Sequence, residues 1–247
     1  LILGVSGTLT DLNFHEKFAI ENLYKIKQSS VMPSFFGCSN MCFNEEEDFH
    51  CSYAVDEWLN QVYRHTYTKI AKNRAVIIFF EDDEKLEKFR KEYSTQFDRV
   101  NVLTVNTKGT ERDQFINEAG VAKTVTLATC QMGRGVDFKS SVVVEKNGGV
   151  HVIQTFFSPD VKEEIQIKGR TARKDNRGSY ELIVCGKDLP EMEPETEIDS
   201  GYSYKILDKD RRIKSLKTNE KLAADIKQAQ KNHEMTLEYL KSFCEKK

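Results

Sequence analysis

Short apolar segments alternate with amphipathic segments between about residues 54 and 186. This alternation is typical of a parallel sheet whose strands are joined by right-handed helical crossovers. The runs at 75–80 and 124–129 contain no charged residue, as expected of strands that are buried on both faces. The pattern predicts an α/β fold with one parallel sheet sandwiched by helices.

The individual elements are predicted from the spacing of the apolar residues. Spacings of three and four predict helices over 55–71, 84–93, 111–119 and 160–173. Short apolar runs predict strands over 75–80, 100–105, 124–129, 142–145, 150–156 and 180–185. A last helix is expected over 219–243, where one stripe is formed by Leu222, Ile226, Ala229, His233, Leu237 and Leu240.

The chain therefore divides into four parts. We expect a connector over 1–53, the α/β domain over 54–186, an acidic, proline-containing linker over 187–203 and a helical extension over 204–247. The extension could bind an unknown partner, but its stripe is more typical of packing within the same protein. The first residues are apolar and carry no Met or signal-peptide pattern, so we expect a piece of a longer protein.

Composition excludes several classes of protein. The 37 Lys and Arg are balanced by 39 Asp and Glu, which removes the strong basic signature of a dedicated nucleic-acid binder. The longest apolar run, 75–80, is far shorter than the ~20 residues of a membrane span. Six scattered cysteines form no disulfide framework and favour a reducing, cytoplasmic location.

A phosphate-binding loop of the form G-x-x-x-x-G-K-[ST] is absent from the sequence. Gly4–Thr8 lacks the lysine, and Lys108–Thr110 lacks the upstream glycine. The acids at 81–83 follow a strand, but they are interpreted as the start of a helix rather than as magnesium ligands. The chain alone is not expected to hydrolyse ATP.

Two segments nevertheless carry the residue types of a nucleotide site. After the strand at 124–129 come Gly133, Arg134, Gly135 and Asp137. The glycines let the backbone approach a ligand closely, the arginine offers several N–H donors to a phosphate, and the aspartate can accept hydrogen bonds from ribose hydroxyls. Further on, Gln166, Arg170 and Arg173 have helical spacings of four and three and are expected to share one helical face. Arg170 and Arg173 are candidates for arginine fingers that stabilise charge on a γ-phosphate.

Three blocks in this order resemble the second RecA-like lobe of the preprotein translocase ATPase SecA: ATCQMGRGVD at 128–137, GGVHVIQT at 148–155 and QIKGRTAR at 166–173. Gly7 and Thr8 are similar to the coupling motif that ends the family's first lobe, so the resemblance covers roughly residues 1–186. It implies that residues 1–53 include the end of that first lobe and that 204–247 resembles the start of the family's scaffold domain.

The resemblance also implies a ligand and partners. Arg134, Asp137, Arg170 and Arg173 would face ATP held by an upstream motor lobe, which would also supply the ligands of Mg²⁺. A polypeptide would be the substrate, and a membrane channel is a possible partner of a cytoplasmic, peripherally membrane-bound protein. Ala172 stands where the family has a glycine, a change expected to lie inside a helix, and the segment at 156–162 also departs from the family.

Several alternatives stay open at this point. Gly133–Asp137 could be an ordinary turn, and Arg170 and Arg173 could belong to a solvated charged face. The lobe could serve a nucleic-acid helicase, or it could be a non-catalytic interaction module. Zinc would suit the residue types of Cys38, Cys42, His50 and Cys51, but their spacing matches no strong ligand pattern, so loop cysteines are the preferred interpretation and no metal is expected.

Overall fold

The chain forms two compact units, one comprising residues 32–207 and the other residues 1–31 together with 208–247. The structure is a computed structural model that describes residues 3–191 and 202–244. Each unit is described here by itself. The larger unit contains the sheet and is called the lobe below.

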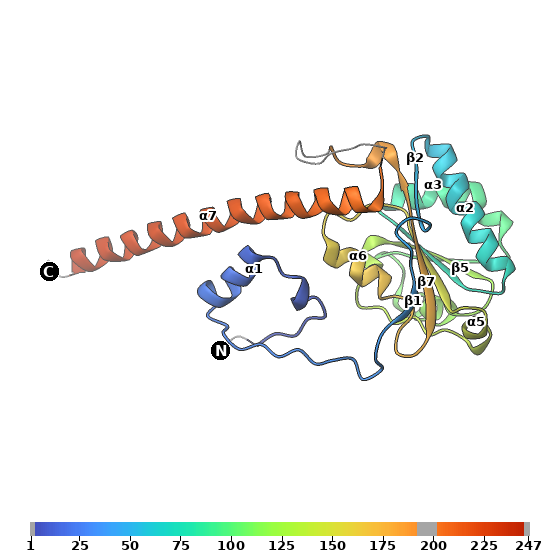
Figure 1. Ribbon diagram of the computed structural model, residues 1–247, viewed down its shortest axis with the longest axis horizontal. Coiled ribbons are helices and arrows are strands. Elements are labelled where there is room, and N and C mark those ends of the chain that lie inside the picture. The colour runs from blue at the N-terminus through green and yellow to red at the C-terminus, as the bar shows by residue number, and fades with distance from the viewer. Residues whose placement is uncertain (1–2, 192–201, 245–247) are drawn as a thin grey trace. The chain divides into compact units, whose positions relative to one another are not determined.

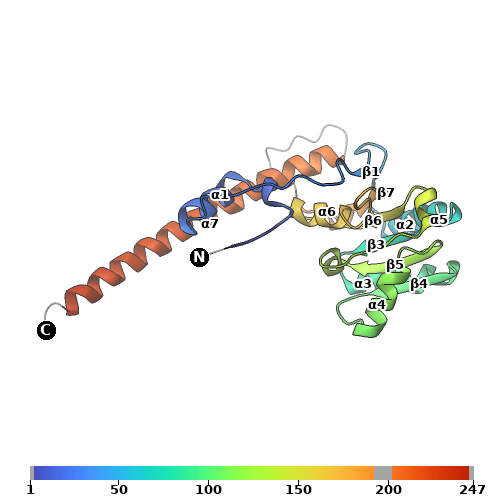
Figure 2. The ribbon, with the colours of Figure 1, turned by 90° about the horizontal axis from the view of Figure 1, so that it is seen from below.

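The lobe is built on a seven-stranded sheet in which every pair of strands is parallel. The strand order is β1-β7-β6-β3-β5-β4, and β2 also pairs with β7 (Figures 1 and 2). The strands are β1 (Asn40–Cys42), β2 (Phe49–Ser52), β3 (Val76–Phe80), β4 (Arg99–Leu103), β5 (Thr124–Thr129), β6 (Val150–Gln154) and β7 (Arg177–Cys185). The helices are α2 (Val55–Ala71), α3 (Asp83–Tyr93), α4 (Gly109–Glu118), α5 (Val142–Lys146) and α6 (Val161–Lys168).

Helices cover both faces of this sheet (Figure 2). Neighbouring residues of β3 point to opposite faces of the sheet. Ile78 packs with the buried residues of α2 and α3, whereas Ile77 packs with those on the side of α4, α5 and α6. All five residues of β3, all six of β5 and all five of β6 are buried. The predicted α/β fold, one parallel sheet sandwiched by helices, is confirmed.

The bounds of most predicted elements lie within a few residues of those in the structure. The helix over 55–71 and the strand over 124–129 have the predicted bounds. The strand predicted over 142–145 is wrong, because these residues form α5. Its three valines favour a strand by propensity, but Ser141 caps a helix by accepting a hydrogen bond from the Val144 N–H.

The sheet extends beyond the expected start of the domain at residue 54. Strands β1 and β2 pair one after the other with β7, through Asn40–Cys42 and Phe49–Ser52. They are joined by a tight connection in which the Asn44 N–H donates to Asp48 Oδ2 at 2.8 Å. These strands are too short to show an apolar pattern, so the sequence indicated only a connector.

The smaller unit combines the N-terminal segment with most of a long helix. Helix α1 (Phe14–Phe18) is capped reciprocally by Asn13 and Glu16, and a π-helical turn, Ala19–Leu23, follows it. Phe18 and Leu23 line a hollow with Leu222 and Ile226 of α7, so part of the predicted apolar stripe packs on this segment. Helix α7 (Tyr204–Cys244) starts earlier than the predicted helix over 219–243, and the expected linker over 187–203 lies largely outside the described residues.

Strand β5 offers a test of the buried core. The hydroxyl of Thr126 is buried and has no hydrogen-bond partner among the residues that the structure describes. We expect Thr126→Val to raise the free energy of unfolding by about 1 kcal/mol, because it replaces an unpaired hydroxyl with a methyl group of similar size.

The matched control is Val125→Thr, next to it on the opposite face of the same buried strand. This change should lower the free energy of unfolding, because it buries a new hydroxyl. Urea unfolding of both variants measures the difference. Destabilisation by Thr126→Val would show that its hydroxyl has a partner.

Candidate functional site

The loop after β5 is held in place by buried residues and presents polar ones to solvent. A 3-10 turn, Cys130–Gly133, leads into it, and the side chains of Val136 and Phe138 enter the core. Arg134, Gly135 and Asp137 are exposed between them. The loop is therefore anchored at alternate residues, with its polar groups facing outward.

The two glycines of this loop have different roles. Gly133 lies so close to α6 that an added Cβ would come within 2.8 Å of Ile167 Cγ1, so it permits close packing. Gly135 has φ +68° and open space around it, so it supplies a left-handed backbone conformation. Of these two glycines, Gly135 is the one that is exposed and has a left-handed backbone conformation.

The helix predicted over 160–173 is shorter than expected, since α6 ends at Lys168. Gly169 follows as its C-cap, and the Thr171 hydroxyl donates to the Val150 carbonyl oxygen at 2.6 Å. Gln166 therefore lies on α6, whereas Arg170 and Arg173 follow it. The expectation that the three side chains share one helical face is wrong.

Arg170 connects the end of α6 to the loop. Its Nε donates to the Gln166 carbonyl oxygen at 3.0 Å, and its Nη1 donates to the carbonyl oxygen of Val136. Burial, reinforced by the charge of Arg173, lowers the pKa of Arg170. Two of its donor groups are thus used inside the lobe.

Arg173 is more accessible and pairs with the carboxylate of Asp137. The two side chains are 40% and 58% exposed, and an ion pair of this kind contributes only about 0–1 kcal/mol. A stronger anion can therefore displace Asp137 from Arg173. The arrangement leaves one partly exposed guanidinium close to the loop.

The structure thus brings the two predicted segments together, but at an unexpected end of the sheet. Ligand loops of open α/β sheets gather at the carboxyl ends of the strands. Here Thr171 contacts Val150, the first residue of β6, and Gly178 near the start of β7. The loop after β5 runs alongside α6 toward the amino ends of β6 and β7, where it meets the arginines.

The other predicted site residues are less closely associated. Gln166 has a buried side-chain oxygen that lacks a hydrogen-bond partner within the described part of the chain. Gly7 and Thr8 lie in the smaller unit. Cys38 and Cys42 are exposed. Cys51 follows His50 on β2, and because successive side chains of a strand point to opposite faces, the two side chains point apart.

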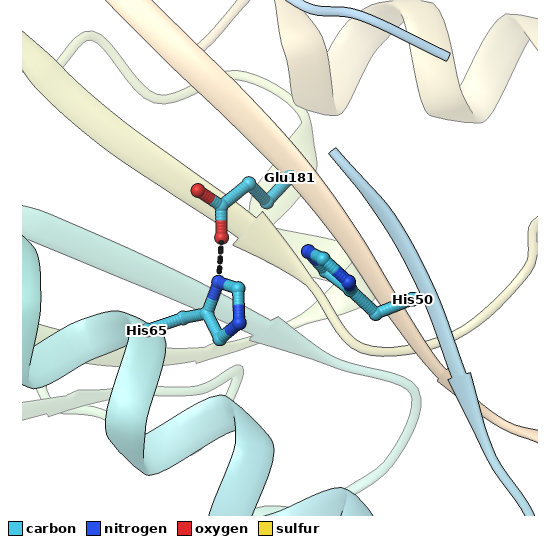
Figure 3. Close-up of side chains that lie close together, drawn as sticks. All are labelled: His50, His65 and Glu181. Carbon is cyan, nitrogen blue, oxygen red and sulfur yellow. Dashed lines mark hydrogen bonds and ion pairs between the residues drawn. The ribbon is translucent and has the colours of Figure 1, made fainter. Parts of the chain in front are cut away.

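His50 instead lies beside His65 of α2 and Glu181 of β7 (Figure 3). His65 Nδ1 is 2.6 Å from Glu181 Oε2, and the rings of His50 and His65 have their centroids 4.4 Å apart. Sequence reasoning missed this cluster, since its members are separated by 15 and 116 residues in the chain. The one signal in the sequence was Glu181, a charged residue within the predicted strand at 180–185.

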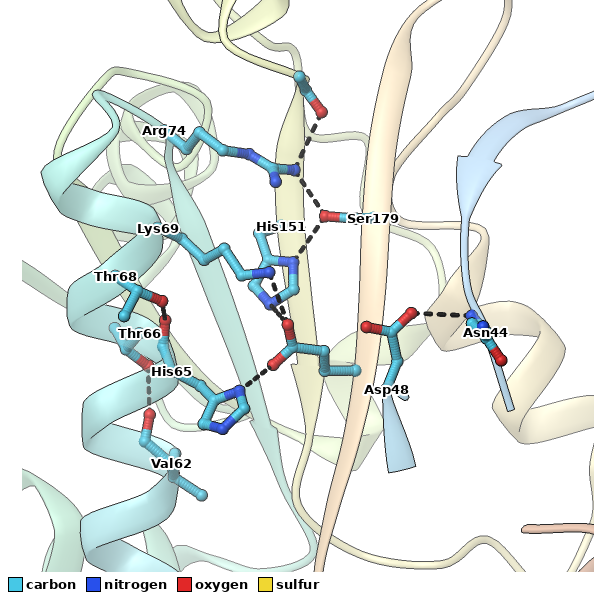
Figure 4. A network of polar contacts seen from close by, with 12 residues as sticks. Asn44, Asp48, Val62, His65, Thr66, Thr68, Lys69, Arg74, His151 and Ser179 are labelled. Atoms are coloured by element: carbon cyan, nitrogen blue, oxygen red, sulfur yellow. Dashed lines mark hydrogen bonds and ion pairs between the residues drawn. The ribbon is translucent and has the colours of Figure 1, made fainter. Parts of the chain in front are cut away.

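Glu181 is paired with His65, Lys69 and His151 in a buried polar network. Figure 4 labels these three partners. Lys69 Nζ is 2.6 Å from Glu181 Oε1, and the fully buried His151 lies 3.7 Å from the same oxygen. Burial alone would raise the pKa of Glu181, but its contacts with His151, His65 and Lys69 hold that pKa well below its usual value. Burial lowers the pKa of His151 to about 4, so this imidazole is neutral.

Comparison with known proteins shows which proteins this lobe resembles. Residues 56–175 match the helicase conserved C-terminal domain. SecA 2 of Nitrosospira multiformis is 40% identical over 73 residues, which are 30% of this chain and 11% of that protein. SecA of Halothermothrix orenii is 31% identical over 121 residues, 49% of this chain and 14% of that protein.

A looser likeness links the chain to the C-terminal domain of the DEAD-box protein Dbp5, with a TM-score of 0.44 and 20% identity over 57% of this chain and 76% of that one. The matches to the two SecA proteins span only a small part of their length. The match to the helicase conserved C-terminal domain lies within the lobe. Its resemblance to SecA is confirmed.

Ala172 tests the geometry of the arginine segment. It has φ +50°, a left-handed conformation, instead of lying inside a helix as expected. A left-handed conformation costs a residue with a Cβ roughly 1–2 kcal/mol. We expect Ala172→Gly to raise the free energy of unfolding by up to about 1 kcal/mol, after the greater flexibility of the unfolded chain is deducted.

The control is Ala71→Gly at the end of α2, where the same change should lower stability, because the backbone there is helical. Thermal and urea unfolding of both variants measure the effects. A loss of stability in Ala172→Gly as large as in Ala71→Gly would show that residue 172 is not left-handed.

Proposed function

We propose that the lobe completes an ATP site with a second motor lobe in a SecA-like, ATP-driven motor. The observation that carries this proposal is the weakly paired, accessible Arg173 beside Asp137 and the exposed part of the loop, Arg134 and Gly135. The resemblance to SecA implies a two-lobe motor protein as the context of this site. ATP would bind between the lobes, and the sequence of this chain contains no phosphate-binding loop of its own.

The two arginines have different tasks in this proposal. Arg170 positions the loop through its contacts with Val136 and Gln166, so it acts as a positioning residue. Arg173 exchanges the carboxylate of Asp137 for the terminal phosphate of ATP. Its planar fork then stabilises the negative charge that grows as the phosphate is transferred to water.

We propose roles in the same site for the other predicted residues. Arg134 would contribute a second cationic group, Gly133 and Gly135 the shape of the loop, Asp137 an acceptor and Gln166 a polar group beside Arg170. Mg²⁺ would neutralise phosphate charge when bound, and its ligands would come from the other lobe. Gly7 and Thr8 would couple the two lobes.

A polypeptide is the proposed substrate of the complete motor. The relatives are named protein translocase subunits, and the balanced charge of this chain does not indicate a nucleic-acid partner. A membrane channel would be a partner of such a protein in the cytoplasm. Among the described helices, none has an apolar stretch that could cross a bilayer.

The 247-residue chain alone is expected to bind ATP weakly and to show no turnover, because one lobe offers too few phosphate donors. Calorimetric titration with Mg-ATP and a phosphate-release assay measure both. Addition of the separately produced partner lobe should restore binding. Tight stoichiometric binding by the chain alone would contradict a shared site.

In the complete two-lobe protein, Arg173→Ala should lower the ATPase turnover number by ten- to a thousandfold and change the affinity for ATP much less. The physical reason is that Arg173 pairs with charge that develops toward the transition state. Arg173→Lys should restore only part of the rate, because an ammonium group cannot form the two-pronged contact.

Arg64→Ala is the matched control, since Arg64 is an exposed arginine on α2, on the other side of the sheet. Steady-state kinetics at saturating ATP separate turnover from binding. Equal turnover of the Arg173→Ala and Arg64→Ala proteins would remove Arg173 from the active site.

A further inference from the structure

We propose that His50, His65 and Glu181 form a binding site for a divalent transition-metal ion, with Zn²⁺ as the ion that suits it best (Figure 3). The site is separate from the arginine segment and from the proposed ATP site. The three residues come from β2, α2 and β7. A bound ion would therefore join the edge strand β2 and the covering helix α2 to the neighbouring strand β7.

The positions of the donor atoms support this site. One nitrogen of each imidazole and one carboxylate oxygen all lie within 4.8 Å of one another. Zinc bonds of about 2.0–2.2 Å in a tetrahedron place ligand atoms roughly 3.3–3.5 Å apart. To reach these spacings, His50 would move inward and His65 would separate from Glu181, whose atoms are now 2.6 Å apart.

The chemistry of the donors favours zinc over calcium or magnesium. Two imidazoles and one carboxylate are a ligand set typical of zinc sites, whereas Ca²⁺ and Mg²⁺ prefer oxygen ligands alone. A neutral imidazole is the form of histidine that binds metal, so zinc binding should weaken as the pH falls. A water molecule would complete the tetrahedron, since His65 is 28% exposed and solvent can reach the site.

The second oxygen of Glu181 is already held by other groups. Lys69 lies 2.6 Å from Oε1, which leaves Oε2, the oxygen facing His65, for the metal. Outer groups of this kind fix the orientation of a ligating carboxylate. The charge of Lys69 also repels a cation, so we expect weaker binding than in a site without a nearby ammonium group.

Calorimetric titration of the 247-residue chain with ZnCl₂ tests the proposal. We expect saturable binding of one ion and a rise in the thermal unfolding temperature on zinc addition. His50→Gln should weaken binding on the order of tenfold or more, as should His65→Gln. His50→Gln is the safer variant for folding, because it leaves the hydrogen-bonded pair of His65 and Glu181 in place.

Two controls address other zinc ligands in the chain. His233→Gln removes an exposed imidazole on α7, and the double change Cys38→Ser with Cys42→Ser removes two exposed thiols; both proteins should bind zinc as the parent does. Substitution by Co²⁺ should give visible bands of tetrahedral coordination without a thiolate charge-transfer band.

The proposal is overturned if no saturable binding is found. It is also overturned if the cysteine variant loses binding while His50→Gln keeps it, or if His50→Gln binds zinc like the parent. None of these outcomes depends on ATP turnover. The metal site and the proposed motor function can therefore fail independently.

Discussion

The burial of the parallel sheet on both faces is the constraint on which the rest of the lobe depends. Because β3, β5 and β6 are buried throughout, few polar side chains fit on the faces of the sheet without compensation. Glu181 shows such compensation, because Lys69 and His65 of α2 contact its buried carboxylate. Accessible polar chemistry is thus confined to the loops and to this one network at the sheet edge.

The proposed nucleotide edge combines rigid and easily broken contacts. Val136, Phe138 and the close approach of Gly133 to Ile167 fix the loop against the core, and Arg170 ties it to the end of α6. Arg173 and Asp137 are joined only by an exposed ion pair. This contrast suits a site that keeps its shape while one cation changes partners.

Much of the fold could be predicted from apolar spacing, because long segments such as 55–71 and 124–129 show a clear period. Helix α5 could not be predicted, because the cap at Ser141 overrides the strand preference of its valines. Strands β1 and β2 could not be predicted either, because they depend on long-range pairing with β7. In the candidate site, the sequence predicted which segments meet but not that Gly169 ends α6 before the arginines. The association of His50, His65 and Glu181 depends on tertiary packing alone and leaves almost no local signal.

In the proposed site, Arg173 changes its partner from Asp137 to a phosphate. A crystal structure of the complete two-lobe protein with Mg-ADP and beryllium fluoride, a mimic of the terminal phosphate, tests this exchange. We expect the Arg173 guanidinium to lie within hydrogen-bond distance of the fluoride ligands and to be separated from Asp137, while Arg170 still contacts Val136. An Arg173 that remains paired with Asp137, with the phosphate mimic bound elsewhere, would contradict it.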